Sequence, residues 1–139
     1  MDAVTLQNRI KGTFPDFLGI KFLEVSTRTI VAEMVVQKEF CNFSGYMHGG
    51  AVMTFADTLG ALGTIVNMQE NFRTTTLESK TNFLRSVNEG ETITAESRRL
   101  HLGRSTMVWE TTVRKETGKL VAVVTQTQMI MERKPGKQK

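Results

Sequence analysis

The sequence predicts an α+β domain in which one antiparallel sheet is set against a single long helix. Three observations lead to this: two strand-like runs close together near the start, an apolar stretch over residues 51–66, and four strand-like runs after it. A chain of 139 residues is long enough for one domain with a real core.

The segment before the apolar stretch predicts a short helix and a hairpin. Residues 2–11 fit a helix that Gly12 and Pro15 would end. Residues 18–26 and 29–36 read as strands joined by Thr27 and Arg28. Residues 38–47 then form a loop with turn-favouring side chains.

Residues 51–66 predict a long buried helix, because they are apolar on nearly every side and include one charge, Asp57. One face carries bulky side chains at helical spacing and should pack on the sheet: Val52, Phe55, Leu59, Leu62 and Val66. The opposite face is mostly small, and we expect a second copy of the chain to approach it: Met53, Asp57, Gly60, Ala61 and Thr64.

The second half of the chain predicts an antiparallel meander. Strand-like runs cover residues 74–84, 91–102, 105–114 and 119–131, with turn signals such as Asn88-Glu89-Gly90 between them. Residues 134–139 are basic and we expect them to be disordered, which leaves residues 1–133 as the single domain.

Composition narrows the function classes. The net charge is +4, and residues 71–139 carry +6, which suits an anionic ligand. Nucleic acid is disfavoured, since Trp109 and Tyr46 are single and distant. The lone Cys41 permits no internal disulfide, and neither a signal peptide nor a membrane span is evident, so we expect a cytoplasmic protein without a membrane partner.

Two features of the helix predict chemistry. His48-Gly49-Gly50 would expose unpaired N–H groups at the helix start, which attract an anion or a developing oxyanion. Asp57 is a costly buried carboxylate unless it is paired or used. It follows His48 by nine residues, about 13 Å along the axis and on roughly the opposite side. Asp57 would therefore serve the helix start of another copy, in a composite site at a dimer interface.

The spacing of Asn42, His48-Gly49-Gly50 and Ala56-Asp57 resembles that of hotdog-fold acyl-CoA thioesterases, the group related to phenylacetate-pathway and 4-hydroxybenzoyl-CoA enzymes. The resemblance covers about residues 16–131. It implies a hotdog fold: an antiparallel sheet wrapped around one long central helix, here with a short N-terminal helix. It also implies hydrolysis of an acyl- or aryl-CoA thioester to free acid and coenzyme A, with no cofactor.

The resemblance also implies roles for single residues. The N–H of Gly49 or Gly50 would polarise the thioester carbonyl, and Asp57 of the neighbouring subunit would act as base or nucleophile. Asn42 would help position the attack, and Thr76, within the run of threonines 74–76, would orient the acid or water. His48 would shape the loop near the carbonyl. The family commonly forms homotetramers, as dimers of dimers.

Other candidates have plainer explanations beside the functional ones. Met47 could line the acyl pocket, or simply fill a gap. Three arginines near a predicted hairpin could hold the nucleotide phosphates or belong to a solvated turn: Arg98, Arg99 and Arg104. No metal site is predicted, because His48, His101 and Cys41 form no cluster in the sequence.

Two alternative functions remain open at this stage. Other hotdog enzymes, the acyl hydratases and dehydratases, use a histidine with an acid farther along the helix and a proline-rich loop, which this sequence lacks. A non-catalytic domain that binds or senses acyl-CoA would share the scaffold without consuming its ligand.

Overall fold

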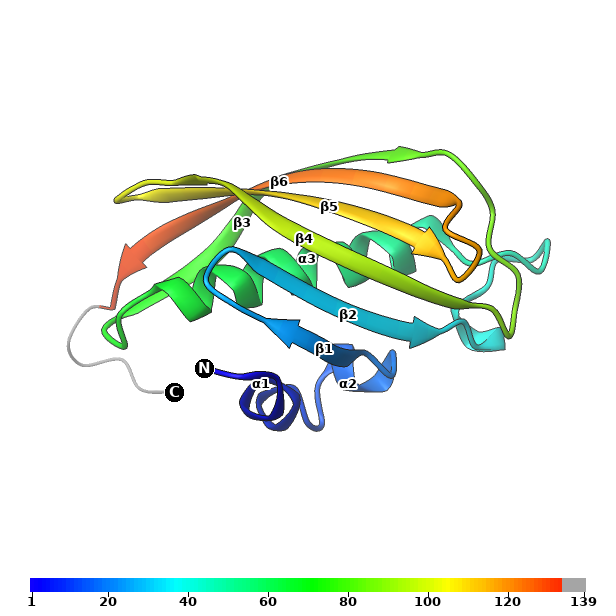
Figure 1. Ribbon diagram of the computed structural model, residues 1–139, viewed down its shortest axis with the longest axis horizontal. Coiled ribbons are helices and arrows are strands. Elements are labelled where there is room, and N and C mark those ends of the chain that lie inside the picture. The colour runs from blue at the N-terminus through cyan, green and yellow to red at the C-terminus, as the bar shows by residue number, and fades with distance from the viewer. Residues whose placement is uncertain (134–139) are drawn as a thin grey trace.

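The computed structural model describes residues 1–133, and in it a curved antiparallel sheet wraps around one long helix, α3 (Figure 1). The helices are α1 (Ala3–Arg9), α2 (Phe14–Phe17) and α3 (Gly49–Asn67), and a 3-10 turn covers Lys38–Phe40. The strands are β1 (Lys21–Val25), β2 (Thr29–Val35), β3 (Phe72–Phe83), β4 (Thr92–Leu102), β5 (Thr106–Lys115) and β6 (Leu120–Glu132). The predicted α+β class is confirmed, while the predicted tail, residues 134–139, lies outside the described residues.

The predicted meander is wrong in one strand. The sheet order is β1-β2-β4-β5-β6-β3, so β4, β5 and β6 form the meander and β3 lies at the far edge, paired with β6. The order of the strand-like segments along the sequence does not indicate that β3 pairs with β6. Residues 84–91 make the crossing from β3 to β4 possible, passing the start of α3 (Figure 1).

A short helix, α2, replaces the first part of a predicted strand. Pro15 lies in the first turn of α2, where a missing N–H is tolerated. The proline therefore helps to begin α2, in addition to following the end of α1. Gly19, at φ +70°, then turns the chain into β1, which begins at Lys21 rather than at residue 18.

The hydrophobic core lies between α3 and the β1, β2 and β4 side of the sheet. The predicted stripe on α3 is confirmed there, because Val52, Phe55, Leu59 and Leu62 are all buried. The inward residues of β2 and β4, among them Ile30, Ala32, Met34, Ile93 and Ala95, are buried against it. Helix α1 closes this side with Leu6 and Ile10.

The small face of α3 is covered by the chain's own sheet, which corrects the predicted contact with a second copy at Gly60 and Thr64. A Cβ at Gly60 would lie 2.4 Å from Gln126 Nε2, and one at Gly63 would lie 2.7 Å from the Trp109 ring. The Trp109 Nε1–H donates to Thr64 Oγ1 at 2.9 Å. Glycine is needed here so that β5 and β6 can approach the helix closely.

The two edges of the sheet differ. Helix α1 covers β1, and the Gln7 side chain bonds to its end, donating to the Ile20 carbonyl (2.9 Å) and accepting from the Phe22 N–H (3.1 Å). Strand β3 is 12 residues long, and within residues 1–133 it pairs on one side only, with β6. A long open edge normally pairs with another strand or is protected.

Helix α3 has the length and composition that a membrane crossing would need. More than half of it is buried inside this fold, as expected of the core helix of a sheet that wraps around it.

The hydrogen bond between Trp109 and Thr64 predicts a stability effect. Thr64→Val keeps the side-chain shape but leaves the buried indole N–H unpaired, so the free energy of unfolding should fall by about 1–3 kcal/mol. Chemical denaturation measures this. The control is Thr127→Val, a half-buried position on the outer face of β6, which should change stability by less than about 0.5 kcal/mol. Equal stability of both variants would contradict the argument.

Candidate functional site

The start of α3 is held by His48, the residue just before the helix. Its Nδ1 accepts from the Gly50 N–H (2.9 Å), and its own backbone N–H donates to the Phe40 carbonyl (2.7 Å). Among the described residues no acceptor is found for the Gly49 N–H. The Gly49 N–H is therefore the donor left free at this helix end, where the helix dipole adds partial positive charge.

A hollow of about 380 Å³ adjoins this donor. Its lining is mainly apolar and comes from the loop before α3, the first turns of the helix and the segment after β3: Asn42, Tyr46, Met47, Gly49, Val52, Phe83, Leu84, Arg85, Ser86, Val87 and Val121. The structure thus brings together three of the predicted site residues, Asn42, Met47 and Gly49. An apolar hollow with a free backbone donor can hold an apolar group and its carbonyl.

Asn42 also shapes the loop that borders the hollow. Its Oδ1 accepts from the N–H groups of Ser44 (2.9 Å) and Tyr46 (3.3 Å). This is the turn-forming role that asparagine commonly has. Its predicted part in positioning an attacking group stays a prediction.

A second polar cluster surrounds Asp57, on the side of α3 that faces β3 and β6. Thr76 Oγ1 lies 2.6 Å from Asp57 Oδ1, and Gln128 Nε2 lies 2.7 Å from Thr76 Oγ1. Gln126 Nε2 lies 3.3 Å from both the backbone carbonyl and Oδ1 of Asp57. The structure therefore resolves the open register in favour of Thr76 as the threonine that contacts Asp57.

Sequence reasoning missed Gln126 and Gln128. Both point inward from β6 and are 1% and 0% exposed. The run Thr125-Gln126-Thr127-Gln128 is polar at every position, so no alternation showed which residues face the helix. The sequence offered one signal for these glutamines: polar residues replace the alternating pattern in a strand that otherwise buries valine and alanine.

Within one chain, the free donor at Gly49 and the polar cluster around Asp57 lie far apart. Gly49 and Asp57 are eight residues apart on the same helix, which is about 12 Å along its axis. Neither Asp57 nor Thr76 lines the hollow at Gly49. A carbonyl bound at the helix start therefore cannot reach the carboxylate of the same chain.

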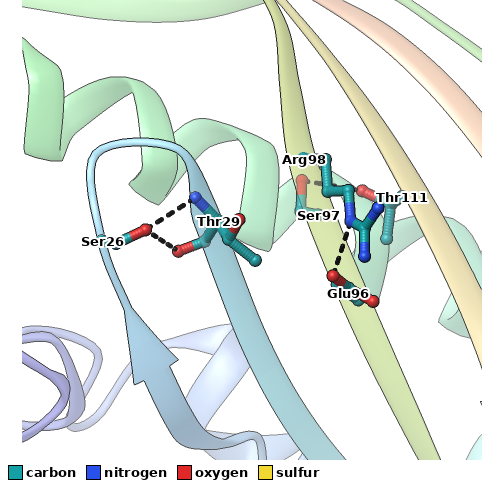
Figure 2. Close-up of polar contacts among 6 residues, drawn as sticks. All are labelled: Ser26, Thr29, Glu96, Ser97, Arg98 and Thr111. Atoms are coloured by element: carbon teal, nitrogen blue, oxygen red, sulfur yellow. Dashed lines mark hydrogen bonds and ion pairs between the residues drawn. The ribbon is translucent and has the colours of Figure 1, made fainter.

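The three predicted phosphate-binding arginines lie away from the hollow. The Nε of Arg98 lies 2.6 Å from Glu96 Oε1. Figure 2 shows this contact, and shows neighbouring Ser97 directed toward Thr111. The bond to Glu96 raises the pKa of Arg98 above its usual range. Arg99 bonds to Asn67 and to the Thr27 carbonyl (2.9 Å) near the end of α3. Arg104 borders a small hollow of about 160 Å³ with Asn67, at that same end.

Hydrogen bonds to Glu91 stabilise residues 84–91, the segment between β3 and β4 that borders the hollow. Its carboxylate accepts from the backbone and side chain of Asn88 and from Lys115 Nζ (2.9 Å). The Asn88 N–H, with a further contribution from Lys115, lowers the pKa of Glu91. Val87, next in the segment, accepts from the Met47 N–H (2.8 Å), which connects this turn to the loop before α3.

Within residues 1–133, no three side chains among His, Cys, Asp and Glu converge where a metal ion could bind. The donors around Asp57 are hydroxyl and amide groups, which hydrogen-bond to a carboxylate and carry no positive charge.

Comparison with known proteins gives a consistent result. Residues 44–122 match the family model described as the Thioesterase superfamily. PA1618 of Pseudomonas aeruginosa is 31% identical over 119 residues, 85% of this chain and 81% of that one. The crystal structure of a variant of PA1618, named a thioesterase, has a TM-score of 0.90 at 28% identity and 95% coverage of both chains.

Two further relatives carry names that mention coenzyme A. The 1,4-dihydroxy-2-naphthoyl-CoA hydrolase of Escherichia coli is 29% identical over 110 residues, 79% of this chain and 80% of that one. The structure of smu.793 from Streptococcus mutans, bound to acetyl CoA, has a TM-score of 0.76 at 28% identity, covering 83% of this chain and 91% of that one.

The Glu91 turn predicts a pH dependence of stability. Because its pKa in the folded protein is lowered from the ordinary 4.5, its contribution is present above that value and is lost as pH falls through the folded pKa. Glu91→Gln should therefore show a smaller fall in Tm than the wild type between neutral pH and about pH 3. The exposed neighbour Glu89→Gln is the control and should keep the wild-type slope. Identical slopes for all three proteins would contradict the assignment.

Proposed function

The chain belongs to the thioesterase superfamily and is an acyl-CoA thioesterase with the hotdog fold, and we propose that two copies together build each of its active sites. The observation that carries this proposal is the separation of about 12 Å, along one rigid helix, between the free donor at Gly49 and the carboxylate of Asp57.

The open edge of β3 supplies a way to join two copies. If β3 pairs with β3 of a second copy about a two-fold axis, the sheet continues and the two α3 helices run antiparallel. Asp57 of one copy then approaches the helix start of the other. Thr76, which holds Asp57, lies on this same edge strand.

The helix start would bind the thioester carbonyl. We assign this to the Gly49 N–H, because the Gly50 N–H, the other predicted donor, is already bonded to His48. Negative charge develops on the carbonyl oxygen as the tetrahedral intermediate forms, and a fixed N–H at a helix start stabilises it. His48 would contribute by fixing the geometry of this turn.

Asp57 of the second copy would then promote attack on the carbonyl carbon. As a general base it takes a proton from water while the water oxygen bonds to that carbon; as a nucleophile its own oxygen attacks first. In either course the carbon–sulfur bond breaks, and the sulfur leaves as coenzyme A thiol after taking up a proton. In the nucleophilic course water then hydrolyses the anhydride formed between the acyl group and Asp57, which releases the free acid and restores the carboxylate. Asn42 would orient the attacking water.

The hollow at Gly49 sets the proposed substrate class. Its apolar wall, which includes Met47, Val52 and Phe83, suits an aromatic or aliphatic acyl group. The ligands in the names of the Escherichia coli and Streptococcus mutans proteins are aryl-CoA and acetyl-CoA compounds, which supports the same class. The placing of nucleotide phosphates at Arg98, Arg99 and Arg104, the tetramer and the cytoplasmic location stay predictions.

The first prediction from the proposed function concerns Asp57. Asp57→Asn should lower kcat by roughly a hundredfold or more, because an amide neither takes a proton nor attacks at neutral pH. Release of free thiol from a panel of acyl- and aryl-CoAs measures this, with Tm as the check that the fold is intact. Near-normal turnover would refute the role of Asp57. Binding of acyl-CoA without thiol release from the wild type would instead favour a binding domain.

The second prediction tests the shared site by mixing two inactive variants. Gly49→Pro removes the proposed N–H at the first helical residue, a position where proline is well tolerated, and His48 has the extended backbone (ψ 137°) that precedes proline. Gly49→Ala keeps the N–H and is the matched control for the contact with Phe83.

Refolding Gly49→Pro together with Asp57→Asn produces mixed dimers in which one of the two sites has both groups intact. The mixture should regain about a quarter of wild-type activity, although each variant alone is nearly inactive. No recovery, with mixed dimers demonstrated by mass, would show that each site lies within one chain.

A further inference from the structure

We propose that Gln126 and Gln128 of β6 are positioning residues that hold Asp57 so that only its Oδ2 is free to react. This inference rests on the proposed function of Asp57. It adds two residues that lie outside the helix start and outside the hollow, and that act through the carboxylate rather than on the substrate.

Gln128 sets the direction of the hydrogen bond from Thr76 to Asp57. The amide nitrogen of Gln128 has only protons to offer, so at 2.7 Å Thr76 Oγ1 must be the acceptor. The hydroxyl proton of Thr76 is then available for Asp57 Oδ1 at 2.6 Å. Because the ionised carboxylate of Asp57 can only accept, the Thr76 proton goes to Asp57 and the amide nitrogen of Gln128 must face Thr76. The single hydroxyl proton of Thr74 is shared between Gln128 Oε1 (3.0 Å) and the Met129 carbonyl (2.9 Å), which is compatible with this orientation.

Gln126 acts on the carboxylate directly. Its Nε2 lies 3.3 Å from the Asp57 backbone carbonyl and 3.3 Å from Oδ1, two acceptors that exclude the flipped amide. The amide rests on Gly60, where any Cβ would lie 2.4 Å from Nε2. The absence of a side chain at Gly60 therefore gives Gln126 its place beside Asp57.

The result is an asymmetric carboxylate. Oδ1 accepts from Thr76 and from Gln126, whereas Oδ2 accepts no hydrogen bond from any residue in the range 1–133. Two donors on one oxygen fix the rotation of the group and hold negative charge there. Oδ2 is left to take a proton from water or to attack the thioester.

Packing does not explain glutamine at position 126. Its Oε1 is buried and has no hydrogen-bond partner among the described residues, a state that costs stability. Methionine has nearly the same shape and would bury no unpartnered acceptor. A glutamine kept at such a cost is typical of a residue that serves a site.

The test compares Gln126→Met and Gln128→Met with Thr127→Val, the residue between them that lies on the outer face of the sheet. Gln126→Met should lose kcat by roughly tenfold to a hundredfold, the usual value of a hydrogen bond to a charged group, with KM nearly unchanged. Gln128→Met removes a bond to the neutral Thr76 hydroxyl and should lose kcat by roughly twofold to tenfold, again with KM nearly unchanged. Gln126→Met should keep or raise Tm. Thr127→Val should match the wild type.

A double-mutant cycle separates positioning from a general structural role. If Gln128 acts through Thr76, then Gln128→Met should add little to the loss already caused by Thr76→Val. Fully additive losses, or losses of kcat that follow losses of Tm, would overturn the proposal for Gln128. Wild-type kcat in Gln126→Met would overturn it for Gln126.

The controls distinguish this inference from the function on which it rests. If the wild type hydrolyses acyl-CoA and Asp57→Asn does not, while both glutamine variants behave like the wild type, the inference fails and the proposed function stands. If the wild type releases no thiol from any acyl-CoA, both are overturned.

Discussion

The structure depends on the need to cover a helix that is apolar nearly all round and carries one carboxylate. Curving the sheet around α3 meets this need, but its two sides do so differently (Figure 1). Strands β1, β2 and β4 present valine, isoleucine and other apolar side chains and form the core with Phe55 and Leu59. Strands β3 and β6 present hydroxyls and amides to the side of Asp57, where a half-buried charge needs donors.

The polar side of the sheet carries a cost in stability that the proposed chemistry of Asp57 would explain. The buried side-chain oxygens without a partner within residues 1–133 all lie on β3 and β6, at Ser79, Thr81 and Gln126. A protein selected for stability alone would place apolar side chains there. The arrangement instead keeps Asp57 oriented, beneath an edge strand that remains open to a second copy.

The rigidity of α3 links the chemistry to assembly. The donor at Gly49 and the carboxylate at Asp57 are fixed on one helix about 12 Å apart, so no local motion brings them together. If two α3 helices lie antiparallel in the proposed dimer, Asp57 of one copy approaches Gly49 of the other without any change in the conformation of either chain. In the proposed dimer, the same geometry would make activity depend on assembly, because each hollow would be completed by Asp57 of the neighbouring copy.

Local pattern was enough to predict the α+β class, the central helix and its apolar stripe, because helical and strand periodicity are properties of neighbouring residues. The candidate site residues from Asn42 to Thr76 came instead from the family resemblance, and their catalytic roles stay predictions. Tertiary structure alone decided that β3 lies beside β6, that Gln126 and Gln128 reach Asp57, and that the small face at Gly60 packs on the chain's own sheet. It also decided that His48 occupies the Gly50 N–H and leaves that of Gly49 free. These contacts join residues up to 69 positions apart, and no local periodicity encodes which strands become neighbours.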